Sequence, residues 1–304
     1  MRLVTFERHD PLGPDRVRVG AQIENDRGSF VLDLAQADPR LSSEMSLLLG
    51  AGAPALGLAR AAVAAAGPDA LLPAAGVSVL APVPHPGKIL CVGYNYVGHD
   101  AAGAVERPEF PEIFAKTANT VVGPEQAIVL PRASRQVDYE AELAVVIGTG
   151  GRDIAPSDAM EHVAGYTLFN DVSARDWQGR GSQWLLGKSF DTFGPLGPAL
   201  VTADEVPDPQ CLDIELTVNG RTMQRASTRD MIFSVRYLVA YLSQVMTLEP
   251  GDIISTGTPA KLPEAAANQR FLAPGDVVRL TIGGVGTLSN PVASSAPAQA
   301  RSAR

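Results

Sequence analysis

The chain has 304 residues, of which 45% are hydrophobic and 19% are charged, proportions typical of a globular protein with a sizeable core. Its net charge of −8 argues against nucleic acid or an anionic membrane as the main partner. Because the sequence shows neither an apolar signal segment at its start nor a run of membrane-spanning length, we expect a cytoplasmic protein. Cys91 and Cys211 lie in apolar contexts and are predicted to be buried free thiols, with one disulfide as the alternative.

Residues 1–75 predict a small N-terminal α+β domain. Apolar residues alternate on both sides of the turn residues 25–28, which predicts a β-hairpin over 17–34. Serines at the start of 42–49 and a proline at the start of 54–66 predict two short helices, the second rich in alanine. No residue in this region indicates a catalytic or ligand-binding role.

The rest of the chain predicts a larger, predominantly β domain. Residues 76–87 are rich in Pro, Gly and Ala and predict a linker. From 88 to 293, short apolar segments alternate with Gly and Pro turns, so the fold class is α+β with strands dominant. One helix with an apolar face is predicted to start at a cap on Asp230 and to end near Met246. The tail, 294–304, is predicted to be disordered.

Three carboxylates alternate where one predicted strand enters the core. The apolar, β-branched run 143–147 predicts a buried strand. Alternate side chains share a face of a strand, so Asp138, Glu140 and Glu142 are expected on one face, with neighbouring Cα atoms about 7 Å apart. Carboxylates gathered there repel one another and are costly to desolvate, and a divalent cation resolves both problems. Acidic residues at the solvated end of an edge strand are the ordinary alternative.

Asp171 ends a second strand-like segment, 166–170. A cluster of functional side chains follows it, namely Arg175, Asp176, Gln178 and Lys188. Oxygen ligands without a neighbouring His or Cys favour Mg²⁺ or Mn²⁺ over zinc. The two segments together therefore indicate a metal site.

Five segments, in this order, resemble the fumarylacetoacetate hydrolase family: 138–148, 165–178, 187–198, 230–235 and 248–259. The likeness extends over residues 85–295. It implies a rolled, mixed β-sheet catalytic domain, a smaller N-terminal domain and a homodimer. The family acts on short keto acids and diketo acids, and it includes hydrolases, decarboxylases and isomerases.

The resemblance also implies roles for single residues. Glu140, Glu142 and Asp171 match the family's metal ligands, here for Mg²⁺ or Mn²⁺. Lys188 matches a lysine that holds the substrate and its developing negative charge beside the metal. Asp138 is expected to balance a nearby cation or to cap a turn.

Further matches are expected to contact the substrate. Arg175 and Gln178 face it by resemblance, with Arg175 offering two donors to a carboxylate; a structural ion pair is the alternative for Arg175. Thr258 matches a loop that binds the substrate carboxylate, or else it is a turn residue. Tyr96 and its neighbour Tyr94 are expected to wall the pocket or to lie in the core.

His99 resembles the family histidine that activates water as a general base. Many relatives carry a glutamate three residues later, where this chain has Ala102. Without an orienting carboxylate the imidazole is less basic, which harms hydrolysis most and decarboxylation least. The residues that could replace the missing glutamate are Asp100, Glu106, Glu109 and Glu112.

The sequence leaves three candidate functions. The first is hydrolysis of a carbon–carbon bond in an acylpyruvate-like 2,4-diketo acid, with release of pyruvate. The second is an oxaloacetate-type decarboxylase or keto–enol isomerase that uses the same metal. The third is a non-catalytic metabolite-binding protein, which the clustered carboxylates disfavour.

Overall fold

The computed structural model describes residues 1–9, 17–98 and 108–295. The α-helices are α1 (Leu34–Ala37), α2 (Met45–Gly50), α3 (Gly52–Ala65), α4 (Arg175–Gln178), α5 (Leu185–Lys188), α6 (Val235–Val245) and α7 (Pro263–Ala267). The strands are β1 (Arg2–Arg8), β2 (Val17–Asn25), β3 (Gly28–Asp33), β4 (Leu71–Pro73), β5 (Val77–Leu80), β6 (Ile89–Gly93), β7 (Glu112–Lys116), β8 (Val121–Val122), β9 (Ile128–Leu130), β10 (Val137–Asp138), β11 (Ala141–Ile147), β12 (Val163–Asn170), β13 (Ser173–Ala174), β14 (Gly194–Thr202), β15 (Asp213–Val218), β16 (Arg221–Ser227), β17 (Ile253–Ser255), β18 (Val277–Ile282) and β19 (Gly286–Ser294).

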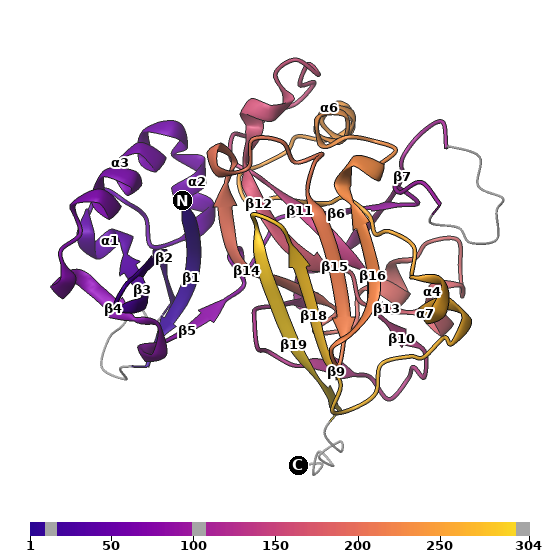
Figure 1. Cartoon of the computed structure of the whole chain (residues 1–304). Coiled ribbons are helices and arrows are strands. Elements are labelled where there is room, and N and C mark those ends of the chain that lie inside the picture. The colour runs from indigo at the N-terminus through magenta and orange to yellow at the C-terminus, as the bar shows by residue number, and fades with distance from the viewer. Residues whose placement is uncertain (10–16, 99–107, 296–304) are drawn as a thin grey trace, which may run out of the picture.

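A long mixed sheet forms the centre of the molecule. Its strands run in the order β4-β3-β2-β1-β14-β12-β11-β17-β6-β7, with β5 beside β1 and β8 beside β14. A second sheet, β16-β15-β18-β19-β9, lies in front of β11 and β12 in Figure 1. The expected strand-rich α+β fold is confirmed.

Both faces of β11 are covered, and its side chains alternate between two cores. Leu143 and Val145 belong to the core that includes residues of the second sheet, such as Leu216. Ala144 and Val146 belong to the core formed with the N-terminal region. A strand buried on both faces is apolar at nearly every position, which explains the unbroken run 143–147.

The N-terminal region joins the central sheet. β1 pairs with β14 through Arg2 opposite Val201 and Leu3 opposite Leu200. Helices α1, α2 and α3 lie on the outer side of these strands (Figure 1). The hairpin predicted over 17–34 is present as β2 and β3. The domain boundaries at 75 and 88 stay a prediction, since the sheet continues across them.

Several local expectations differ from the structure. Helix α6 is capped by Ser234, whose side chain accepts a hydrogen bond from the backbone N–H of Tyr237. Asp230 instead closes a capping box with Ser227 around a short 3-10 helix, so the predicted cap was wrong. Cys91 is buried as expected but Cys211 is exposed, and both are free thiols.

Two further points concern the ends of the chain and its helices. Strand β19 runs to Ser294, so the tail predicted over 294–304 begins in ordered structure, and 296–304 lie outside the described residues. None of the helices in the described ranges combines the length and apolar character that crossing a membrane requires.

Candidate metal centre

The carboxylate segment is not one continuous strand. Asp138 ends β10, which pairs with β13, whereas Glu142 lies in β11, which pairs with β12. Between them, the backbone N–H of Glu140 donates to Asn170 Oδ1, and the backbone N–H of Asp171 donates to the carbonyl of Glu140. The expected single strand is therefore two strands, because the backbone leaves the strand at residues 139–140. Asp138 and Glu140 nevertheless share Arg175 as a partner, and Glu140 lies beside Glu142.

Two of these carboxylates meet Asp171 at the end of β12. One oxygen each from Glu140, Glu142 and Asp171 lie within 4.8 Å of one another, and all three side chains are buried. The antiparallel register of β11 and β12 causes this meeting, since it sets Ala141 opposite Asn170. We call these three residues the carboxylate cluster.

Basic side chains connect the cluster to Asp138 through a chain of ion pairs in which the sign of the charge alternates. Four cations and three carboxylates take part, and Lys116 and Lys188 are both excluded from solvent. The links are Lys261–Asp138 at 2.7 Å, Asp138–Arg175 at 3.0 Å, Arg175–Glu140 at 2.7 Å, Glu140–Lys188 at 2.7 Å, Lys188–Asp171 at 2.6 Å and Asp171–Lys116 at 2.6 Å.

The pKa values of Glu140 and Glu142 are shifted in opposite directions because their partners differ. Burial raises the pKa of Glu140, but Lys188 and Arg175 outweigh burial and hold that pKa below its usual range. Burial raises the pKa of Glu142 well above its usual range, and Asp171 and Glu140 raise it further. Neutral donors hold Glu142, namely the hydroxyl of Ser255 and the backbone N–H of Gly257.

Lys116 and Lys261 were not among the predicted site residues, although the composition contained a signal. The sequence has four lysines among 25 basic residues. Three of the four belong to the ion-pair chain. The fourth, Lys88, pairs with Asp252 elsewhere. Because arginine supplies the other 21 basic residues, the few lysines were candidates for positions that suit a compact ammonium group.

Two cavities adjoin the carboxylate cluster. The cluster cavity holds about 100 Å³, and its walls include Glu140, Glu142 and Lys188 together with the aromatic side chains Tyr94, Phe114 and Trp184. The Lys261 cavity holds about 240 Å³. Both cavities share Glu140, Arg175 and Thr258 as lining residues.

The structure brings most of the predicted site residues together. Lys188, Arg175, Gln178 and Thr258 all line the cluster cavity. Arg175 Nη1 donates to Gln178 Oε1 at 3.0 Å, so these two side chains act as a unit. The ion pair expected as the alternative for Arg175 is also present, with Asp138 and Glu140 as partners.

Other predicted residues do not reach the cluster cavity or cannot be placed. Tyr96 is buried in the core and lines neither cavity, while its neighbour Tyr94 does line one. His99, Ala102, Asp100 and Glu106 lie outside the described residues. Glu109 and Glu112 are described; both are exposed and neither lines a cavity.

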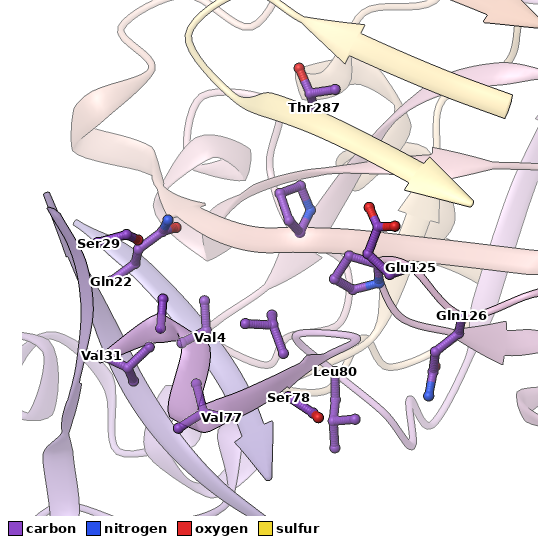
Figure 2. Close-up of a pocket in the computed structure, with 14 residues that line it drawn as sticks. Val4, Gln22, Ser29, Val31, Val77, Ser78, Leu80, Glu125, Gln126 and Thr287 are labelled. Carbon is purple, nitrogen blue, oxygen red and sulfur yellow. The ribbon is translucent and has the colours of Figure 1, made fainter. Parts of the chain in front are cut away.

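A third cavity lies away from the cluster, between the N-terminal strands and the 124–126 loop (Figure 2). It holds about 630 Å³ and is larger than the other two. Its walls are mainly apolar, with Val4, Val31 and Val77 on one side. Among the described residues that line it, Glu125 is the charged one, so it offers no set of converging groups for catalysis.

The carboxylate cluster fits a divalent cation. It offers three buried oxygen ligands, one each from Glu140, Glu142 and Asp171, which is the ligand type that Mg²⁺ and Mn²⁺ prefer. Burial and then repulsion from Asp171 and Glu140 raise the pKa of Glu142, and a cation bound among the three carboxylates would offset both effects.

Comparisons with known proteins place the chain among relatives of one family. The family model described as "Fumarylacetoacetate (FAA) hydrolase C-terminal" matches residues 88–293. A human protein named "Oxaloacetate tautomerase FAHD2A, mitochondrial" is 47% identical over 294 residues, which are 96% of this chain and 91% of the human protein.

Two solved structures extend the comparison. Maleylpyruvate hydrolase from Sphingobium sp. SYK-6, in complex with manganese (II) ion and pyruvate, is 33% identical with a TM-score of 0.78, over 97% of this chain and 100% of that one. The 5-carboxymethyl-2-hydroxymuconate delta-isomerase from Mycobacterium smegmatis is 34% identical with a TM-score of 0.75, over 98% of this chain and 100% of that one.

Proposed function

The chain belongs to the fumarylacetoacetate hydrolase family, and we propose that it is a Mg²⁺- or Mn²⁺-dependent tautomerase. The proposed reaction interconverts the enol and keto forms of oxaloacetate or a closely similar 2-keto acid. The observation that carries the proposal is the buried carboxylate cluster, which is bridged by Lys188 and opens to a cavity of about 100 Å³. The human relative named an oxaloacetate tautomerase supports the choice of reaction.

Tautomerisation moves one proton. In the keto-to-enol direction a C3–H bond breaks and an O–H bond forms at the 2-keto oxygen, so nothing is oxidised or reduced. A divalent cation bound by Glu140, Glu142 and Asp171 would supply Lewis-acid stabilisation of the enolate. The Lys188 ammonium lies between Glu140 and Asp171. It can donate a hydrogen bond to the 2-keto oxygen of the substrate as that oxygen gains negative charge.

The remaining side chains orient the substrate. Asp138 and Glu140 hold the Arg175 guanidinium in place. Because Gln178 Oε1 accepts from Arg175, the Gln178 amide nitrogen is the group that can donate to a substrate carboxylate. Burial excludes water from Lys188, which strengthens its interactions with Glu140 and Asp171. His99, predicted from the sequence as the base that activates water, is here proposed as the base for the C3 proton.

The second function is hydrolysis of a 2,4-diketo acid, the reaction that the sequence motifs favoured. The maleylpyruvate hydrolase structure with manganese and pyruvate supports it. Hydrolysis also needs a base that activates water. The histidines within the described ranges, His9, His85 and His162, line none of the three cavities, and His99 stays the predicted base for this reaction.

One experiment separates the candidate reactions. The enol absorbance of oxaloacetate is followed with Mg²⁺, with Mn²⁺ and with EDTA, beside a coupled assay for pyruvate released from oxaloacetate, acetylpyruvate and fumarylpyruvate. A tautomerase accelerates the loss of enol above the metal-only rate and releases little pyruvate. Pyruvate release from the diketo acids would favour the hydrolase, and release from oxaloacetate alone would favour a decarboxylase. A Lys188→Met variant is expected to lose the activity while remaining folded by circular dichroism.

A further inference from the structure

The Lys261 cavity contains a cation that the proposed chemistry at the carboxylate cluster does not use. Lys261 Nζ donates to both oxygens of Asp138, at 2.7 and 2.8 Å, and to Gln269 Oε1 at 3.1 Å. Asp138 is buried and fixed by Arg175, whereas Gln269 is exposed and neutral. A carboxylate is a stronger acceptor for an ammonium than an amide oxygen, so it can replace Gln269 after a rotation of that side chain.

The two cavities are adjacent and share Glu140, Arg175 and Thr258 as lining residues. Arg175 links the two sites, because it pairs with Glu140 of the carboxylate cluster and with Asp138, the partner of Lys261. Thr258 Oγ1 accepts from Gln224 Nε2 at 2.9 Å, so the Thr258 hydroxyl can donate its own proton to a ligand. A 2-keto acid bound at the cluster can therefore extend past cationic and hydroxyl donors toward the ammonium of Lys261.

The charge balance of the site favours a ligand with two negative charges. The four cations of the ion-pair chain balance Asp138, Glu140, Asp171 and Glu142 when all four carboxylates are ionised. A divalent cation adds two positive charges in a buried region, where an unbalanced charge is costly. A dicarboxylate restores neutrality, whereas a monocarboxylate leaves one positive charge over.

We propose that the Lys261 cavity is a subsite for the second carboxylate of a dicarboxylic 2-keto acid, with Lys261 as the residue that contacts it. This inference rests on the proposed function, because it assumes that the keto-acid end of the ligand lies at the carboxylate cluster. Oxaloacetate already carries such a distal carboxylate, and the inference adds the residue that selects for it: Lys261 makes the site prefer 2-keto acids with a carboxylate at the far end over those with an alkyl end.

The test measures binding rather than turnover and uses two keto acids of equal carbon number. 2-Oxoglutarate and 2-oxovalerate differ only in the distal carboxylate. Their dissociation constants are measured by isothermal titration calorimetry with the Mn²⁺-loaded protein. We expect the wild type to bind 2-oxoglutarate at least about tenfold more tightly, since a charged hydrogen bond contributes on the order of 1.5–3 kcal/mol. Lys261→Met is expected to reduce the ratio of the two dissociation constants, 2-oxovalerate over 2-oxoglutarate, to near one. Lys261→Arg is expected to preserve this ratio.

Two more variants guard against a purely structural effect. Gln269→Glu keeps Lys261 but places a carboxylate beside its ammonium, so it should lower the ratio without removing the partner of Asp138. Arg225→Met is the matched control: it also removes one positive charge, but Arg225 is exposed on β16 and pairs with Glu215 at the surface. It should leave the ratio unchanged.

The outcomes that overturn the inference are distinct from those that overturn the function. If the wild type binds both keto acids equally, or if Lys261→Met weakens both by the same factor, then Lys261 only positions Asp138 and Arg175. If the Mn²⁺-loaded protein binds neither keto acid, the proposed function fails and takes this inference with it.

Discussion

Lys116 Nζ lies 2.6 Å from Oδ1 of Asp171, and solvent reaches neither side chain. Burial lowers the pKa of Lys116, while the negative charge of Asp171 acts in the opposite direction. A fully buried pair of this kind is costly to form, and it is far more costly to break on one side only. Lys116 thus secures one oxygen of Asp171 while Lys188 contacts the other.

Lys116→Met should therefore destabilise the metal-free protein by about 3–5 kcal/mol, because Asp171 is left with less compensation for its buried charge. Saturating Mn²⁺ should recover part of the loss, since a cation at the cluster supplies the missing charge. Urea unfolding with and without Mn²⁺ measures both effects. The exposed pair Arg60–Asp204 provides the control, and Arg60→Met should cost no more than about 1 kcal/mol. A loss in Lys116→Met that Mn²⁺ leaves untouched would contradict the electrostatic account.

Glu142→Gln should separate stability from metal binding. The amide cannot take on the charge that burial, Asp171 and Glu140 disfavour at this position, so the metal-free variant should be at least as stable as the wild type. The same change removes an anionic ligand, so Mn²⁺ affinity should fall by about tenfold or more, the low end of a charged interaction. Thermal unfolding of the metal-free protein and electron paramagnetic resonance of free Mn²⁺ report the two quantities. Undiminished Mn²⁺ binding would mean that Glu142 is not a ligand.

Gly187→Ala should displace Lys188. A Cβ at Gly187 would lie 2.5 Å from the backbone nitrogen of Gln178, and that backbone cannot yield as a flexible side chain would. The segment that carries Lys188 must then shift, and a shift near 1 Å at a catalytic group costs roughly 100-fold in rate. Gly181→Ala is the control, because a Cβ there meets no atom within 4 Å. Equal activities of the two variants would show that the contact at Gly187 is not limiting.

Trp184→Ala should change which keto acids fit. Trp184 lines the cluster cavity and packs edge-on against Tyr94 and Phe114, with ring centroids 5.4 and 5.2 Å away. Its removal enlarges the cavity, so kcat/KM for long diketo acids should rise relative to that for oxaloacetate. Trp177, the other tryptophan, lines neither of the two cavities at the cluster. Trp177→Ala should leave the ratio between substrates unchanged, and a parallel change in both variants would refute a role for Trp184 in selection.

Local sequence patterns predicted those elements whose position depends on one turn or on the burial of neighbouring side chains. The hairpin of β2 and β3 followed from alternating side chains around a turn, and the buried β11 followed from an unbroken β-branched run. The start of helix α6 was predicted wrongly. Asp230 and Ser234 are both good capping residues, and the reciprocal bonds between Ser227 and Asp230 decide which of them begins α6.

The sequence alone indicated a carboxylate site at Glu140, Glu142 and Asp171, because carboxylates beside apolar strands are costly to bury together unless a cation binds them. It did not indicate the role of Lys116 or Lys261. Lys116 lies 55 residues from Asp171 and Lys261 lies 123 residues from Asp138. The strand order β12-β11-β17-β6-β7 brings Lys116 to Asp171, and the isolated bridge between Gln224 and Lys261 helps to hold Lys261 near Asp138; both ion pairs are shorter than 3 Å. Which charges neutralise one another depends on distance in space, and tertiary structure alone sets that distance.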